Sequence, residues 1–326
     1  MGRPRFLVVR LGAMGDVIHA LPAVATLKHS FPHSHVAWVI DEKWAPLLAG
    51  NRFVDEVIRF ERRKLADVLR LWRLLRAGRY GTVIDFQGLM KSAVVAALAR
   101  PERIHGFHQS QVRERLAALV YSHRTLARSA HVVERNLELA AAAGAVRAAH
   151  LFPLPPGEPE DQLPEGEFVL ASPLAGWIAK QWPLERYGEL ARLLRTGLGL
   201  PLVLDGPPEQ TPQFHSIPGV AVHRSGLAGL IHATRRAVAV VGIDSGPMHL
   251  AAALRKPGVA IFGPTDPARN GPYGDSFTVL RSPGAQTSYK RRSRIEESMS
   301  RTAPEEVFEQ LKARLAMPAA RHGADA

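Results

Sequence analysis

The stretch FLVVRLGAMGDVIHALP, residues 6–22, begins as an apolar run, turns at two glycines and continues into a helical pattern. An apolar run, a glycine-containing turn and a helix in that order form the strand–loop–helix unit of parallel α/β sheets. The glycine spacing differs from the GxGxxG fingerprint, and Asp16 occupies the place where a phosphate would meet the helix N-terminus. The turn therefore predicts an α/β fold, and it leaves two interpretations of Asp16, a helix cap or a catalytic base.

The same alternation of apolar runs and helical patterns continues in both directions from a central break. That break is LFPLPPGEPEDQLPEGE, residues 151–167, whose proline, glycine and acidic residues indicate a linker. We therefore expect two Rossmann-like domains in succession. Strands are expected at 5–9, 35–40, 54–58, 81–85, 102–106 and 168–173 and within 201–207, 221–226, 237–246 and 258–267, and helices at 16–30, 43–49, 64–77, 90–99, 111–119, 131–143, 183–197, 227–236, 247–254 and 303–315.

Composition limits the class of protein. The chain has 326 residues, of which 46% are hydrophobic and 22% charged, and such values suit a soluble globular protein of two domains. It has no cysteine, which excludes disulfides and thiolate metal sites. No apolar run is long enough to cross a bilayer or to serve as a secretory signal. We expect a cytoplasmic protein.

Positive charge gathers in one part of the chain. The formal net charge is +12, which attracts anionic partners. Arg70, Arg73 and Arg76 recur every three residues on a predicted helix, and we expect its buried side to comprise Leu65, Val68, Leu69, Leu71, Trp72, Leu74 and Leu75. The arginine face is either an ordinary solvated surface or a docking surface for an anionic acceptor. The chain has no recognisable nucleic-acid motif, so no nucleic-acid partner is expected.

Polar motifs follow several of the predicted strands. GIDSGPMHLAAAL, residues 242–254, predicts a turn that opens a helix, which is either an anion site or a simple N-cap at Asp244 or Ser245. Thr265 in FGPTDP and Lys180 in LAGWIAKQWP are candidate ligand contacts or ordinary surface residues. Because ligands of parallel sheets bind beyond the carboxyl ends of strands, the cleft between the two domains is the expected site.

Other chemistries lack their motifs. The sequence has no zincin histidine spacing, no GxSxG elbow and no lysine after a glycine-rich loop of Walker type. Its fourteen histidines are scattered. Neither a metal site nor a dinucleotide site is predicted.

Taken together, the motifs resemble glycosyltransferase family 9, the bacterial lipopolysaccharide heptosyltransferases, and look most like heptosyltransferase I. The resemblance covers about residues 5–315 and rests on RLGAMGDVIHALPAV, FQGLMKSA, HVVERNLELA, AKQWP, IDSGPMHLAAAL and FGPTDPARNGPYG in this order. It implies a GT-B fold of two Rossmann-like domains facing across a cleft. Residues 1–155 would bind the acceptor, residues 156–302 the nucleotide sugar, and the segment 303–326 would hold a helix returning to the first domain, and the tail.

The resemblance also implies a reaction. The enzyme would transfer L-glycero-D-manno-heptose from ADP-heptose, with inversion, to a 3-deoxy-manno-octulosonic acid (Kdo) residue of the lipid A inner core, without metal or other cofactor. It would work at the cytoplasmic face of the inner membrane, in peripheral association with that anionic surface. The alternative is a family 9 enzyme with another nucleotide sugar or another anionic glycan acceptor.

Site residues follow from the same resemblance. Asp16 matches the catalytic base, Lys180 the lysine at the donor phosphates, and Glu209 the acid at the ribose, with Gln210 competing for that register. The implied donor-binding set is Lys180, Glu209, Asp244, Ser245, Gly246, His249 and Thr265, and the implied acceptor-binding set is Arg62, Arg63, Lys64, Arg70, Arg73 and Lys91. The chain departs from the family pattern at Ala175 and Gly176, where threonines are common, and at Gly12 and Ala13, where serines are.

Overall fold

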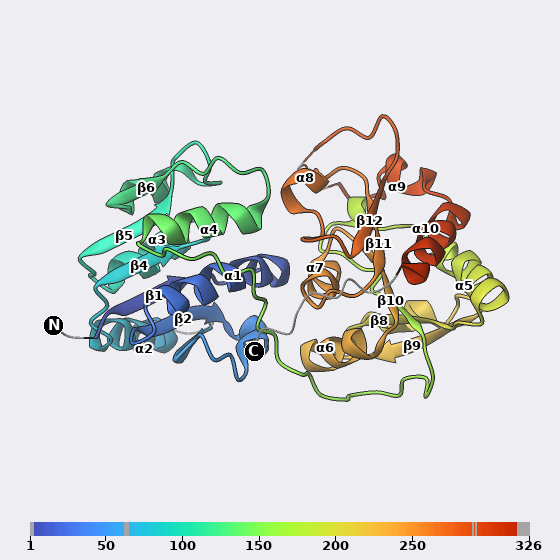
Figure 1. Cartoon of the computed structure of the whole chain (residues 1–326), viewed down its shortest axis with the longest axis horizontal. Coiled ribbons are helices and arrows are strands. Elements are labelled where there is room, and N and C mark those ends of the chain that lie inside the picture. Colours follow the sequence, from blue (N-terminus) through green and yellow to red (C-terminus); the bar gives the residue numbers. More distant parts are fainter. Residues whose placement is uncertain (1–2, 62–64, 289, 291, 318–326) are drawn as a thin grey trace. The chain divides into compact units, whose positions relative to one another are not determined.

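The computed structural model describes residues 3–61, 65–288, 290 and 292–317. The chain divides into two compact units, Met1–Pro155 and Pro156–Ala326 (Figure 1). Each unit is an α/β domain, so the predicted fold class is confirmed.

The first unit is built on a parallel sheet, six-stranded in its described residues, with the order β3-β2-β1-β4-β5-β6. Its inner strands bury every residue or nearly so, which explains their continuous apolar runs. The strands are β1 (Arg5–Val9), β2 (His35–Asp41), β3 (Glu56–Phe60), β4 (Thr82–Asp85), β5 (Arg103–Phe107) and β6 (His123–Thr125), and the helices are α1 (Met14–Ser30), η1 (Glu42–Leu48), α2 (Leu65–Ala77), α3 (Met90–Leu98), η2 (Arg115–Val120) and α4 (Val132–Ala142).

The second unit repeats this architecture. Its sheet, six-stranded in the described part, is parallel in the order β12-β11-β10-β7-β8-β9. The strands are β7 (Val169–Ala171), β8 (Leu202–Gly206), β9 (Val220–Arg224), β10 (Ala239–Ile243), β11 (Gly258–Phe262) and β12 (Phe277–Arg281). The helices are η3 (Ile178–Lys180), α5 (Leu184–Leu198), η4 (Thr211–Phe214), α6 (Leu227–Arg236), α7 (Gly246–Ala253), α8 (Pro267–Asn270), α9 (Glu297–Arg301) and α10 (Pro304–Ala316).

The last helix requires a correction. The family resemblance implies a return to the first domain, but α10 packs on α5, β11 and β12 of the second unit. Val307, Phe308 and Leu311 of α10 are part of that unit's hydrophobic core. The apolar face of α10 is covered there, which explains its placement; the segment 318–326 lies outside the described residues.

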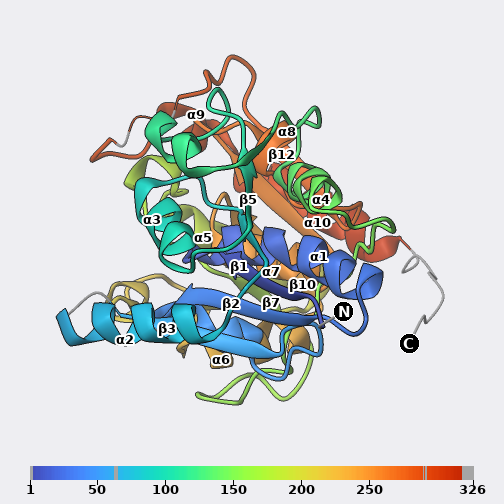
Figure 2. The ribbon, with the colours of Figure 1, turned by 90° about the vertical axis from the view of Figure 1, so that its left-hand side faces the viewer.

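The apolar side of α2 requires a second correction. Leu71 and Leu75 are buried against the sheet, but Val68, Leu69, Trp72 and Leu74 are 40–49% exposed. Figure 2 shows α2 beside β3, the strand at the edge of the sheet. A helix in that position has only one narrow stripe covered, so most of its apolar residues stay at the surface; the side chain of Leu65 is outside the description.

Two further differences are small. The predicted helices at 43–49 and 111–119 are 3₁₀ segments, and the strands β6 and β12 were not predicted. In the described part of the chain, no helix has the length and apolar character that crossing a membrane requires.

The core of the first unit contains a histidine that makes its stability depend on pH. His105 is 4% exposed and stacks on His123 with ring centroids 4.6 Å apart. Burial, together with the charges of His123 and Arg103, lowers the pKa of His105 to about 4 from 6.5. Between these values the unfolded chain binds a proton that the folded chain does not, so the free energy of unfolding falls as pH falls through this window.

We expect His105→Leu to flatten this part of the pH profile. Between about pH 6.5 and 4, titration of His105 lowers the wild type's free energy of unfolding by at most about 3 kcal/mol. The free energy of unfolding of the variant should fall less over the same range. Urea unfolding curves at half-unit pH steps measure it. Parallel profiles for the two proteins would show that His105 is not the group responsible.

Candidate functional site

Asp16 lies in the first turn of α1. Its Oδ2 accepts a hydrogen bond from the backbone N–H of Ala13 over 3.2 Å. Its Oδ1 lies 2.6 Å from Nη2 of Arg10, and 44% of its side chain is exposed. Asp16 is the third residue of α1 and not the residue that caps a helix beginning at Val17, although its carboxylate does bind the N–H of the N-cap residue Ala13. The carboxylate is also open to solvent, as a base would need to be.

Arg10 fixes the orientation of that carboxylate, and the sequence did not single it out. Its side chain is only 9% exposed, Nη1 donates to the carbonyl of Phe86, and Nε has no partner among the described residues. It directly follows β1 and precedes Asp16 by six residues. A charged residue at the carboxyl end of the first strand was the available signal, but its main contact lies 76 residues away in the chain.

The turn that carries Asp16 is held from two sides. A Cβ added at Gly12 would lie 2.7 Å from the indole nitrogen of Trp44, so a larger residue there would require the Trp44 ring to shift. On the other side, Gln87 Oε1 accepts a hydrogen bond from the backbone N–H of Leu11 over 2.7 Å. The FQG motif therefore supports the Asp16 turn.

A buried carboxylate in turn organises the FQG loop. Asp85 is fully buried and accepts hydrogen bonds from the backbone of Gln87 over 2.8 Å, from Ser92 Oγ over 2.8 Å and from Tyr121 Oη over 2.7 Å. Burial raises the pKa of Asp85 although these hydrogen bonds oppose the rise. Because the carboxylate is enclosed by its partners, it serves the loop's structure.

The predicted acceptor residues that the structure describes lie on two helices, α2 and α3. Arg70 and Arg73 are exposed on α2, and Lys91 is exposed in the first turn of α3. Within the described residues, none of them contacts Asp16. Arg62, Arg63 and Lys64 lie outside the described residues, so their predicted role stays a prediction.

Three of the predicted donor-binding residues, Lys180, Asp244 and His249, lie together in the second unit. Lys180 Nζ lies 2.8 Å from Asp244 Oδ2 and donates to the Asp244 carbonyl over 2.9 Å. His249 Nε2 lies 3.7 Å from Asp244 Oδ1, and the Lys180 ammonium stands 4.8 Å from the centre of the Trp177 ring. Burial alone would raise the pKa of Asp244, but the nearby imidazole of His249 and the charge of Lys180 hold it well below its usual range.

Two hydroxyls that follow neighbouring strands of this sheet have no hydrogen-bond partner among the described residues. Ser245 is the N-cap residue of α7, yet its side chain makes no capping hydrogen bond, so the simple N-cap interpretation fails for it. Ser245 Oγ and Thr265 Oγ1 are both buried and unpaired among the described residues. They follow β10 and β11, which are adjacent parallel strands, so both hydroxyls belong to the same edge of the sheet. Buried polar atoms normally find a partner, and a bound anion would supply one here.

We expect removal of these hydroxyls to separate stability from binding. In Ser245→Ala and Thr265→Val no existing hydrogen bond is lost, so the melting temperature should stay the same or rise slightly. ADP affinity should fall by about 1.5–3 kcal/mol, or at least about tenfold, for each hydrogen bond to a charged phosphate that is lost. Differential scanning fluorimetry and calorimetric titration with ADP measure both. Lower stability with unchanged ADP affinity would mean that ordered water, and not a ligand, serves these hydroxyls.

The remaining predicted donor-binding residues make no contact with the Lys180 side chain among the contacts of the described residues. Gly246 opens α7, where the free backbone N–H groups of a helix start attract anions. Glu209 and Gln210 are both exposed in the loop after β8. The structure does not bring Glu209 to the Lys180 cluster in the described residues, so its ribose-binding role stays a prediction. The described residues contain no group of three or more histidine, aspartate or glutamate side chains arranged for a metal.

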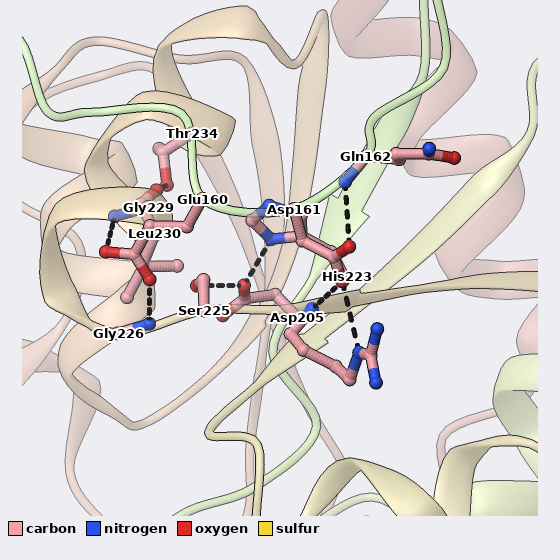
Figure 3. Close-up of polar contacts among 11 residues, drawn as sticks. Glu160, Asp161, Gln162, Asp205, His223, Ser225, Gly226, Gly229, Leu230 and Thr234 are labelled. Carbon is pink, nitrogen blue, oxygen red and sulfur yellow. Dashed lines mark hydrogen bonds and ion pairs between the residues drawn. The ribbon is translucent and has the colours of Figure 1, made fainter.

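The acidic linker has a structural role that sequence reasoning missed. Glu160 accepts hydrogen bonds from the backbone N–H groups of Gly226 and Gly229, at the start of α6, and Asp161 accepts from the backbone N–H of Arg224 over 2.9 Å (Figure 3). These contacts fasten the linker to the second unit. The signal was an acidic pair within an irregular segment, which does not reveal its partners more than sixty residues away.

A second buried network joins the ends of β8 and β9. Asp205 Oδ1 accepts from His223 Nδ1 over 2.8 Å and from Ser225 Oγ over 2.7 Å (Figure 3). Asp205 and His223 are at most 5% exposed, and His223 Nε2 has no partner in the described structure. The network fixes the strand ends from which the loop with Glu209 departs.

Comparisons with known proteins agree with this architecture. Residues 68–299 match the model of glycosyltransferase family 9 (heptosyltransferase). The chain is 30% identical to lipopolysaccharide heptosyltransferase 1 of Escherichia coli K12, with 86% of this chain and 94% of that protein covered, and 32% identical to that of Pseudomonas aeruginosa, with 85% and 84% covered. Its structure is similar to that of E. coli heptosyltransferase WaaC with ADP, with a TM-score of 0.77, 28% identity and coverage of 95% and 99%.

Proposed function

The chain belongs to glycosyltransferase family 9, the heptosyltransferase family, and on this premise we propose that it transfers L-glycero-D-manno-heptose from ADP-heptose to Kdo of the lipid A inner core. The family makes the chain a glycosyltransferase of GT-B fold. The donor, the acceptor and the inverting outcome are the proposal. Its support comes from relatives named as heptosyltransferase 1 and from solved relatives with ADP or an ADP-heptose analogue.

The observation that carries the proposal is the Lys180–Asp244–His249 cluster with the unpaired hydroxyls of Ser245 and Thr265. A diphosphate needs a cation, hydroxyl donors and backbone N–H groups, and all three kinds occur at the carboxyl edge of one sheet. Asp244 positions the Lys180 ammonium. The site therefore suits a nucleoside diphosphate sugar.

In the proposed reaction Asp16 accepts the proton of the attacking acceptor hydroxyl. The hydroxyl oxygen forms a bond to the anomeric carbon of the heptose while the bond from that carbon to the β-phosphate oxygen breaks. The electron pair leaves with ADP, whose added charge Lys180 and the start of α7 stabilise. Attack from the face opposite the leaving group inverts the anomeric centre. The chain's own groups are proposed to suffice, without metal.

The acceptor of this proposal is a lipid-anchored, anionic glycan. We propose cytoplasmic action in peripheral association with the anionic inner membrane, supported by the net charge of +12 and the exposed arginines Arg73 and Arg76. The alternative within the family uses another nucleotide sugar or another anionic glycan. It is favoured by Ala175 and Gly176, which lack the hydroxyls common in heptosyltransferase I at those positions.

An ADP-release assay decides between the two. The purified protein is incubated with ADP-heptose and a deacylated Kdo–lipid A core, with acceptor-free reactions as the control for hydrolysis. A second series replaces ADP-heptose by ADP-glucose, UDP-glucose or GDP-mannose and measures release of the corresponding nucleoside diphosphate, ADP, UDP or GDP. The proposal is supported if ADP-heptose is the only one of these donors from which the nucleotide is released in an acceptor-dependent way. NMR of the product then gives the anomeric configuration. Release with another donor in place of ADP-heptose would favour the alternative.

A further inference from the structure

The exposed face of α2 combines apolar and basic side chains on one stripe. Leu69, Trp72, Arg73 and Arg76 stand at positions i, i+3, i+4 and i+7, which lie above one another on a helix. Leu69 is 49% and Trp72 44% exposed, and both arginines are exposed. Since adjacent exposed apolar side chains with a polar rim mark interaction sites, this stripe is a candidate binding surface.

The positive charge continues past the end of the helix. Arg76, Arg79 and Arg5 line an open depression beside the stripe. Arg5 is anchored there by a hydrogen bond from Nε to the carbonyl of Gly78 and lies over the ring of Tyr80 at 5.6 Å. No carboxylate in the described part of the chain pairs with Arg73, Arg76 or Arg79. The arginines are therefore available to external anions.

Arg70 differs from these arginines. It lines a separate pocket of the same unit together with Glu42, Glu61 and Asp67. Acidic neighbours of this kind offset its charge. Arg70 thus provides a control residue of the same type on the same helix.

We propose that the α2 stripe, defined as Leu69, Trp72, Arg73 and Arg76, docks on the headgroup region of an anionic lipid bilayer. Tryptophan and leucine enter the interface, where the indole is favoured, while arginines meet lipid phosphates. A nucleic acid would engage the charges but leaves no reason for the exposed leucine. The inference rests on the proposed function in one respect, since a lipid-anchored acceptor requires the enzyme at a bilayer.

Vesicle flotation tests the proposal directly. Vesicles of phosphatidylethanolamine and phosphatidylglycerol should carry the wild-type protein, and vesicles of phosphatidylcholine alone should carry much less. Leu69→Gln with Trp72→Gln should lower the partition coefficient at least about tenfold. Arg73→Gln with Arg76→Gln should lower it about 30-fold, and Arg70→Gln should leave it nearly unchanged. Thermal unfolding checks that each variant is folded.

Activity provides a second readout that separates this inference from the proposed function. The Leu69→Gln and Trp72→Gln variant should keep wild-type rates on the deacylated, soluble acceptor and lose rate on the same acceptor embedded in anionic vesicles. If no donor supports transfer, the proposed function fails while flotation still tests the stripe. Equal flotation of wild type and both double variants, or no flotation of the wild type, would overturn the inference. The inference would also be overturned if the Leu69→Gln and Trp72→Gln variant lost self-association without any change in vesicle binding. That result would mean that the stripe binds a second copy of the protein and not a bilayer.

Discussion

Replacement of Asp16 by asparagine is expected to lower turnover by about two to four orders of magnitude while leaving ADP affinity nearly unchanged. Asparagine keeps a side-chain oxygen that can accept the hydrogen bond from the Ala13 N–H. It cannot accept the proton of the attacking hydroxyl. Single-turnover rates with saturating donor, together with calorimetric titration of ADP, measure both quantities.

Comparison with Asp16→Ala separates catalysis from capping. Both variants remove the ion pair with the buried Arg10, so that loss is shared between them. Only alanine also removes the cap, and it should be less stable than asparagine by about 1 kcal/mol. If turnover follows stability, with asparagine close to wild type and alanine impaired, Asp16 is a helix cap and the base lies elsewhere.

The sequence predicted best those elements whose local pattern reflects complete burial. The runs that became β1 and β10 are apolar because parallel strands in the middle of a sheet are covered on both faces. β6 was missed because its three residues, His123–Thr125, are polar and largely exposed at the sheet's edge. No local pattern marks such a strand; its pairing with β5 does.

The wrong prediction of a broad buried face on α2 also arose because a local pattern does not reveal tertiary position. Helical periodicity indicates which residues share a face, but it does not say whether a second layer covers that face. Trp72 and Leu69 are as apolar as Leu71 and Leu75, and only the position of α2 beside β3 decides that the latter pair is buried. The exposed pair became informative about function because it could not be explained by the core.

The candidate site likewise contains residues that a local motif brings together and residues that only the tertiary structure brings together. Asp244, Ser245 and His249 belong to one turn and helix start, so the local motif by itself places them together. The contact of Lys180 with Asp244 joins residues 64 positions apart, and the resemblance to a family implied both without implying that they pair. The contacts of Arg10 are likewise non-local, since its side chain donates to the carbonyl of Phe86, 76 residues away in the chain. Contacts of this type are products of tertiary structure and have no local signature.

The pairing of Lys180 with Asp244 gives the second large expected effect. Lys180→Ala should weaken ADP binding by about 1.5–3 kcal/mol, or roughly 10- to 150-fold, if its ammonium contacts the donor phosphates. The same substitution leaves Asp244, whose side chain is 7% exposed, as a buried carboxylate whose remaining ion-pair partner among the described residues is His249. Breaking such a pair typically costs about 3–5 kcal/mol of stability, so weaker binding by the single variant does not identify its cause.

The double variant Lys180→Ala with Asp244→Asn resolves this ambiguity. Asparagine removes the unpaired charge, so stability should recover relative to Lys180→Ala, whereas ADP affinity should remain low because the cation is still missing. Lys256→Ala is the matched control: this lysine of the same unit donates to the carbonyls of Arg235 and Ala237, and its loss should reduce stability without affecting ADP affinity. If ADP affinity recovers together with stability in the double variant, Lys180 serves only to neutralise Asp244, and the phosphates are held by the α7 start and the hydroxyls of Ser245 and Thr265.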